Sequence, residues 1–197
     1  MDQGTLRIET APTVEPVTLA EAKLWLKIDT TQTDDDDLIT SLIKDAREAA
    51  EHYCKRVFVS QKWKFIFDVQ PTEIKMPLGY VQTVSTVKTY AEDGTATTET
   101  STYYSYDVGE LSRLWIKSGY TWTSTTRLHG IFEIAYIVGW YGGTSDTVGS
   151  NTMPVVPESV KSAIKMIVAK WYEDRGDSAL PDNAIRKLDR YVCHWID

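Results

Sequence analysis

The sequence has little of the chemistry that identifies enzymes and metalloproteins. Its 197 residues include three histidines and two cysteines. His52, His129 and His194 lie in separate segments, none with a second ligand at metal-binding spacing. No C-x-x-C pair, nucleophile elbow, zinc-protease motif or lysine-containing phosphate loop occurs. Cys54 and Cys193 are expected to be buried thiols and not a disulfide. The sequence therefore predicts no catalytic site, metal or cofactor, and we expect that the protein is not an enzyme.

Long apolar runs and a basic excess are also missing. No stretch approaches the ~18 apolar residues that cross a bilayer. The first sixteen residues have neither the basic region nor the apolar core of a signal peptide. We therefore expect a cytosolic site of synthesis and no membrane partner. With 28 acidic and 21 basic side chains, a net charge of -7, a broad nucleic-acid-binding surface is disfavoured.

The acidic excess is concentrated at the front of the chain. Residues 1–56 carry 12 acidic and 7 basic side chains, whereas residues 153–197 carry 7 of each. Such an excess would steer docking onto a basic neighbour, although a solvated acidic face is the simpler interpretation. The run Asp34–Asp37 lacks the spacing of a calcium loop and fits a helix N-terminus better.

Helical patterns occupy both ends of the chain. Thr18 and Glu21 form a capping-box pattern, which predicts a helix start. Apolar residues then recur at three- and four-residue spacing in four segments. The helices are expected over Thr18–Lys27, Leu38–Arg56, Pro157–Arg175 and Pro181–Trp195.

The middle of the chain changes to a period of two, typical of strands with one buried face. Asp93-Gly94 predicts a hairpin turn, because glycine tolerates positive φ. The predicted fold class is α+β: a small bundle of about four helices, two N-terminal and two C-terminal, with an antiparallel β insertion. Residues 1–56 and 153–197 would form the bundle and 57–152 the insertion. Strands are expected over residues 63–69, 73–76, 84–90, 103–108, 111–117 and 131–138.

Aromatic side chains gather in this β region. Aromatic residues on a β surface suit sugar stacking or a protein interface, and they equally suit the core of a small domain. A carbohydrate-binding module therefore remains an alternative. The residues in question are Tyr103, Tyr104, Tyr106, Trp115, Tyr120, Trp122, Trp140 and Tyr141.

Several sequence segments in the predicted helices, taken in order along the chain, resemble the tailed-phage head–tail connector family. Its members are also called adaptor or head-completion proteins. Pro16–Asp29 and Leu38–Tyr53 are similar to the start of that family, and Val156–Arg175 is similar to its rear helix. Met76–Val84 and Tyr90–Gly94 are similar to its branch with a long β insert.

The resemblance implies a structural virion protein, assembled in the host cytoplasm and located at the head–tail interface. Its copies would form a ring, expected to be a dodecamer, that binds the portal protein and a tail or stopper protein. The ring would extend the channel through which DNA passes without sequence-specific contact. Another phage ring, such as a tail terminator, is the alternative within phage. The residues expected to contact the portal are Trp171, Tyr172, Arg175, Arg186, Arg190 and Trp195.

Overall fold

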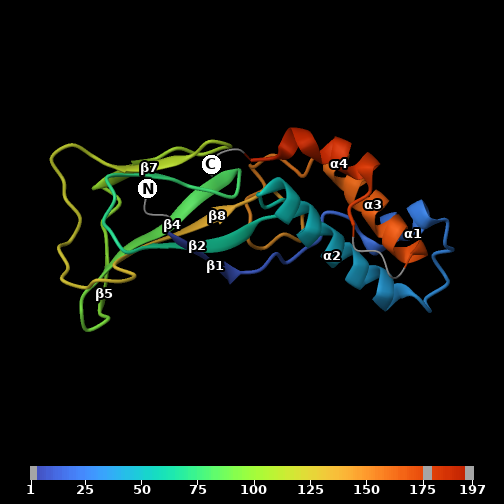
Figure 1. Cartoon of the computed structure of the whole chain (residues 1–197), viewed down its shortest axis with the longest axis horizontal. Coiled ribbons are helices and arrows are strands. Elements are labelled where there is room, and N and C mark those ends of the chain that lie inside the picture. The colour runs from blue at the N-terminus through green and yellow to red at the C-terminus, as the bar shows by residue number, and fades with distance from the viewer. Residues whose placement is uncertain (1–3, 175–178, 194–197) are drawn as a thin grey trace.

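The computed structural model describes residues 4–174 and 179–193. Helices gather at one end of the long axis and strands at the other (Figure 1). This arrangement confirms the predicted α+β class. The helices are α1 (Leu19–Leu26), α2 (Asp36–Cys54), α3 (Glu158–Glu173) and α4 (Asp182–Leu188), and α4 continues into a short 3-10 helix, η1 (Asp189–Tyr191).

The predicted capping box forms at the start of α1. The Thr18 hydroxyl accepts the backbone N–H of Glu21 at 3.2 Å, and Glu21 Oε2 accepts the backbone N–H of Thr18 at 2.8 Å. Partial burial raises the pKa of Glu21, but the hydrogen bonds from Thr18 outweigh it, so that the pKa lies below its usual value. Lys27 ends the helix in the left-handed conformation, with φ of 59°.

The acidic run lies at the start of α2, as predicted, with Asp36 and Asp37 in the first turn of the helix. Asp35 is the N-cap residue, but its side chain makes no capping hydrogen bond. Instead its carboxylate accepts the Tyr172 hydroxyl at 2.6 Å, and Asp36 pairs with Lys23 at 2.6 Å. These contacts connect α2 to α3 and to α1.

The last helix is shorter than predicted. Its apolar spacing would continue the helix past Val192, yet α4 ends at Leu188 and Val192 is extended, with φ of -60° and ψ of 125°. The backbone N–H of Cys193 donates to the carbonyl of Cys54 at 2.8 Å, so that the chain turns back onto the end of α2. This tertiary contact outweighs the local helical period.

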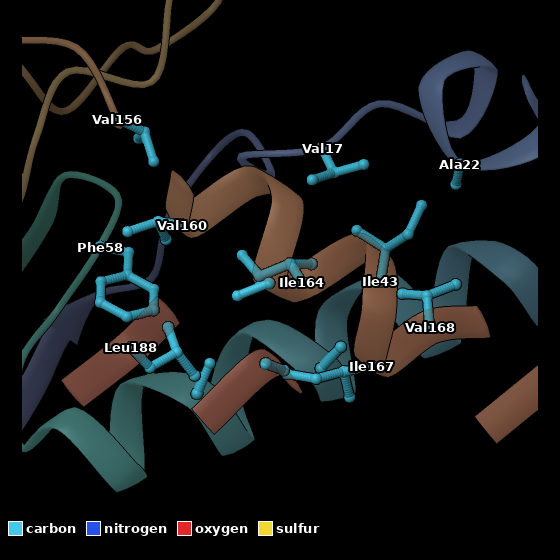
Figure 2. Packing of buried hydrophobic residues seen from close by; sticks show 14 of the residues in the cluster. Val17, Ala22, Ile43, Phe58, Val156, Val160, Ile164, Ile167, Val168 and Leu188 are labelled. Atoms are coloured by element: carbon cyan, nitrogen blue, oxygen red, sulfur yellow. The ribbon is translucent and has the colours of Figure 1, made fainter. Parts of the chain in front are cut away.

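The four helices share one hydrophobic core. Figure 2 shows valine and isoleucine side chains of α3 meeting Ile43 of α2 and Leu188 of α4. Phe58, which follows α2, is also fully buried in this cluster. Burial of this many apolar side chains supplies most of the stability of the bundle. Members drawn in Figure 2 include Val17, Ala22, Val156, Val160, Ile164, Ile167 and Val168.

The strands form two antiparallel sheets. One has five strands in the order β1-β2-β8-β4-β5, and the other has three in the order β3-β7-β6. A second hydrophobic cluster joins side chains of both sheets. The strands are β1 (Thr5–Thr10), β2 (Gln61–Phe67), β3 (Glu73–Lys75), β4 (Val81–Tyr90), β5 (Ala96–Thr98), β6 (Tyr104–Tyr106), β7 (Arg113–Ile116) and β8 (Phe132–Val138).

Two of these strands were not predicted. β1 lies before the first helix and pairs with β2 at the edge of the larger sheet. β5 lies in a segment expected to be a connection, but it completes the predicted hairpin, with Gly94 at φ of 86°. The division into a helical part (1–56 and 153–197) and a β part (57–152) stays a prediction, and β1 joins the first of these segments to the sheet.

Candidate functional site

A buried polar joint connects the helical core to the larger sheet. Glu51, near the end of α2, accepts the backbone N–H of Phe58 at 2.7 Å and an N–H from Arg47 at 2.7 Å. The Gln61 amide, at the start of β2, lies 3.3 Å from the same carboxylate. Burial raises the pKa of Glu51, while the charge of Arg47 and the hydrogen bonds oppose that rise.

Arg47 extends the joint to the connection between β1 and α1. Its Nε lies 2.7 Å from Glu15 Oε2 and its Nη2 lies 3.3 Å from Oε1, a bidentate pair. The guanidinium side chain is only 3% exposed. Burial lowers the pKa of Arg47, but the carboxylates of Glu51 and Glu15 raise it more, so the group remains charged. The charge of Arg47 thus connects three segments: α2, the connection between β1 and α1, and, through Glu51, the chain between α2 and β2.

A second cluster surrounds Arg56, directly after α2. Its guanidinium lies 4.4 Å from the ring centroid of Trp140, a cation–π contact, and pairs with Glu110 in the loop before β7. Its Nη1 also donates to the carbonyl of Tyr191. Trp140 stacks on Phe58 at 5.9 Å and meets Tyr191 edge-on at 5.7 Å. The end of the described chain is therefore held at the junction of helices and sheets.

Between the two clusters lies a cavity of about 750 Å³. One wall is the polar side of α2, and the other is formed by β1, the following connection and β2. Four charged residues of its lining, Glu15, Arg47, Glu51 and Arg56, are engaged in the ion pairs of the two clusters. The lining includes Ile8, Ala11, Pro12, Lys44, Glu48, His52, Lys55, Val57, Trp63 and Leu78.

The residues predicted to contact the portal fall into three groups. Trp171 and Tyr172 support the helical core: Trp171 is 9% exposed and donates to the carbonyl of Ala179, and Tyr172 bonds Asp35. Arg186 and Arg190 are exposed on α4 and η1. Arg175 and Trp195 lie outside the described residues. Portal contact by this set stays a prediction.

The aromatic residues of the β region differ in burial: Tyr104, Trp122 and Trp140 are buried, whereas Tyr103, Tyr106, Trp115 and Tyr141 are half-buried. Trp122 is 8% exposed, packs on Phe132 at 4.9 Å and donates to the carbonyl of Pro71. Tyr104 is also buried in the same cluster. Tyr120, by contrast, is 45% exposed and stacks on Tyr103. Tyr120 is therefore the most exposed aromatic residue of this set.

Residues 4–174 and 179–193 include both cysteines and two of the three histidines of the sequence. In that part of the chain no group of histidine, cysteine, aspartate and glutamate is arranged to hold a metal ion. No helix within it is both long and apolar enough to span a bilayer. Cys54 and Cys193 are both free thiols.

Sequence reasoning found the helices but missed the joint. Glu51, Arg47 and Arg56 look like ordinary polar residues of a helix surface, because their buried partners come from segments before and after the helix. The available signal is that Arg47 interrupts the apolar stripe of α2, four residues after Ile43 and four before Glu51. Nothing in the sequence indicates that Glu15 lies beside them.

One protein family and several solved structures are similar to this chain. Residues 16–111 match the family model described as phage gp6-like head-tail connector protein. A chain from the neck of an empty gene transfer agent (GTA) particle, computed with C6 symmetry, has 18% identity and a TM-score of 0.77. Chains from the native GTA virion and from the native neck, computed with C12 symmetry, have TM-scores of 0.73 and 0.72 at the same identity.

These likenesses span nearly the whole fold. Each covers 95% of this chain and 94% of the other chain, so both the helices and the sheets are included. At 18% identity they establish the fold alone. No curated protein matches the sequence.

Proposed function

We propose that copies of this chain form a ring between portal and tail. The premise is that residues 16–111 match the phage gp6-like head–tail connector family. The family match confirms the resemblance predicted from the helical phrases, and it identifies a structural connector of a phage-like virion. The proposal adds the ring, the portal and tail contacts and the DNA channel.

The observation that carries the proposal is the shared fold of this chain and a neck protein of GTA particles. The likeness extends over 95% of the chain, well beyond the family match. The necks were computed with C6 and C12 symmetry, which supports a ring of twelve copies. In such a ring each interface is heterologous, with one face of a copy docking on a different face of the next.

The electrostatics are compatible with a DNA channel. With a net charge of -7, a ring of these chains would repel the phosphate backbone overall. A repulsive wall lets DNA pass without being retained, and passage of this kind requires no catalytic group.

For the portal contact we propose the surface of α4 and η1. Arg186 and Arg190 are exposed there and available to an acidic partner. Trp171 and Tyr172 would act indirectly, by fixing α3 against Ala179 and Asp35. Arg175 and Trp195 remain part of the proposed set as predicted from the sequence.

The decisive experiment adds purified protein to isolated heads that carry a portal but lack a tail. We expect a ring of added density directly beneath the portal in electron micrographs, and tail attachment only after the addition. Protein that binds instead to the free end of isolated tails would identify a tail terminator. Protein that binds neither, and that binds immobilised glycans in a Tyr120-dependent manner, would support a carbohydrate-binding module.

A further inference from the structure

The larger sheet has a polar face opposite its core face. Residues directly opposite each other in an antiparallel pair share a face, and faces alternate along a strand. Leu6, Phe65 and Ile134 are in register, on the side of the core shared with the smaller sheet. Arg7 and Lys64 are in register on the other side.

Cations from four segments meet on this polar face. Lys62 and Lys64 come from β2, Arg7 from β1 and Lys88 from β4. Tyr90, two residues after Lys88, faces the same way, and Arg127 lies 5.5 Å from its ring centroid. The basic sheet face is defined here as Arg7, Lys62, Lys64, Lys88 and Arg127.

The acids on this face do not neutralise it. Glu9 lies 3.1 Å from Lys62 and 3.5 Å from Lys64, and Glu133 lies 3.6 Å from Lys64. Within the described part of the chain, Arg7, Lys88 and Arg127 form no ion pair. The face is therefore positive, in a chain whose net charge is -7.

The helical end presents the opposite charge. Asp37, Asp45 and Glu48 are exposed on α2. Their spacing of eight and three residues places them along one face of the helix, which we define as the acidic helix face. The exposed Lys44 lies among them, so that three carboxylates outnumber one cation on this face. Glu48 lies 3.3 Å from Nη2 of Arg47, whereas no ion pair is found for Asp37 and Asp45 in the described part of the chain. Asp35 and Asp36 are engaged by Tyr172 and Lys23.

We propose that in the assembled ring the basic sheet face of one copy docks on the acidic helix face of the next copy. This inference rests on the proposed ring. Asp37 lies in the first turn of α2, and that end of the helix points away from the larger sheet (Figure 1), so Asp37 reaches the basic sheet face only between copies. A heterologous interface needs two such different and complementary faces.

A second copy fits the basic sheet face better than DNA does. Lys62 and Lys64 are partly neutralised by Glu9 and Glu133, so the face has only a modest positive excess. Tight binding to DNA needs many unpaired cations along the backbone. A modest excess is instead suited to match the few carboxylates of the acidic helix face.

The test is a charge exchange between the two faces. Arg7→Glu with Arg127→Glu reverses the sheet face without breaking the pairs of Glu9, and Asp37→Lys with Asp45→Lys reverses the helix face. The four changes together leave the net charge at its natural value. Lys75→Glu with Lys117→Glu, on and beside the smaller sheet, is the matched control for the first pair.

We expect each double variant to raise the concentration needed for ring assembly by about tenfold or more, because two like-charged contacts replace attractive ones at every interface. The fourfold variant should assemble close to the natural concentration, and the control should behave like the natural protein. Assembly of the natural protein should weaken as salt is raised from 0.05 to 0.5 M, because this change shortens the Debye length roughly threefold and screens the charges of the two faces. Mass photometry measures ring fraction, and thermal melting checks the fold.

The possible failures are distinguishable. Rings that form normally in both double variants would overturn the pairing of these faces and leave the proposed ring intact. Loss of assembly in the fourfold variant, with its fold intact, would also overturn it. DNA binding that is lost with Arg7→Glu and Arg127→Glu, without any effect on assembly, would assign the face to DNA. Natural protein that forms no ring alone or on portal-bearing heads would contradict the proposed function itself.

Discussion

Arg47 and Glu51 form an ion pair one helical turn apart that points out of α2 into the junction with the sheet, with Nη1 and Oε2 separated by 2.7 Å. On a solvated helix face such a pair contributes little to stability. Here the arginine is 3% exposed and the carboxylate 12% exposed, so each charge depends on the other.

Removal of the arginine alone should therefore be costly. Arg47→Met leaves Glu51 and Glu15 without their cation, and we expect a loss of about 3–5 kcal/mol in the free energy of unfolding. Urea denaturation followed by circular dichroism measures the change. Adding Glu51→Gln should recover part of the loss, since it removes the unpaired charge. Arg186→Met, on the exposed side of α4, is the control, and an equal loss there would contradict the assignment.

Cys54 should be unreactive in the folded protein. Burial raises the pKa of its thiol to about 12, so almost none of it is thiolate at pH 8. We expect iodoacetamide to modify Cys193, which is half-buried, well before Cys54. Peptide mass spectrometry after timed labelling distinguishes the two. Equal labelling of both thiols without denaturant would show that α4 does not cover Cys54 as described.

The capping box makes a pH-dependent contribution to the free energy of unfolding. The folded-state pKa of Glu21 is lowered from 4.5, so between the two pKa values the unfolded chain binds more protons and stability rises with pH. The stabilisation is present above the unfolded pKa and is lost as the pH falls through the folded pKa. We expect natural protein to exceed Glu21→Gln in stability at pH 7, with the difference shrinking as the pH falls below the unfolded-state pKa of 4.5. A difference that grows on acidification would contradict this sign.

Thr18→Ala should remove the other half of the same motif. The backbone N–H of Glu21 loses its acceptor, and the expected cost is about 1 kcal/mol at neutral pH. Thr40→Ala, at an exposed position of α2, controls for the change of side chain. Thermal melting of both variants provides the comparison, and the prediction fails if the two lose equally.

Two glycines with positive φ should differ sharply in their tolerance of alanine. Gly139 has φ of 112°, and a Cβ there would lie 2.6 Å from the carbonyl oxygen of Val59. Gly119 has φ of 85°, with no atom within 4 Å of its Cβ position. Gly119→Ala should cost only the backbone strain, about 1–3 kcal/mol. Gly139→Ala should cost clearly more, because backbone must move. Urea denaturation compares them, and equal costs would contradict the close approach at Val59.

The sequence was a good guide where structure is local. The periods of α2 and α3, the capping box at Thr18 and the turn at Gly94 all depend on neighbouring residues, and each was predicted within a few positions. β1 was missed because an edge strand in which only Leu6 is half-buried has a weak alternating pattern.

The errors and omissions depend on distant contacts. The end of α4 is set by the hydrogen bond from Cys193 to Cys54 and not by its own apolar spacing. The polar joint likewise needs Glu15 and Gln61 beside α2, residues 32 positions before and 10 after their partners. Charge on a helix surface does not indicate which residues a later segment will bury.

The course of the chain through β1 also has a consequence for building hybrids. The polypeptide starts in the larger sheet, leaves it for α1 and α2, and returns as β2, which pairs with β1. Exchanging residues 57–152 for those of a relative would therefore put a foreign β2 against the native β1, and the register from Thr5 to Thr10 would have to match by chance. A transplant that carries β1 together with residues 57–152, and keeps Glu15 for the polar joint, preserves the pairing of β1 with β2. The β part is thus portable only as two pieces of chain.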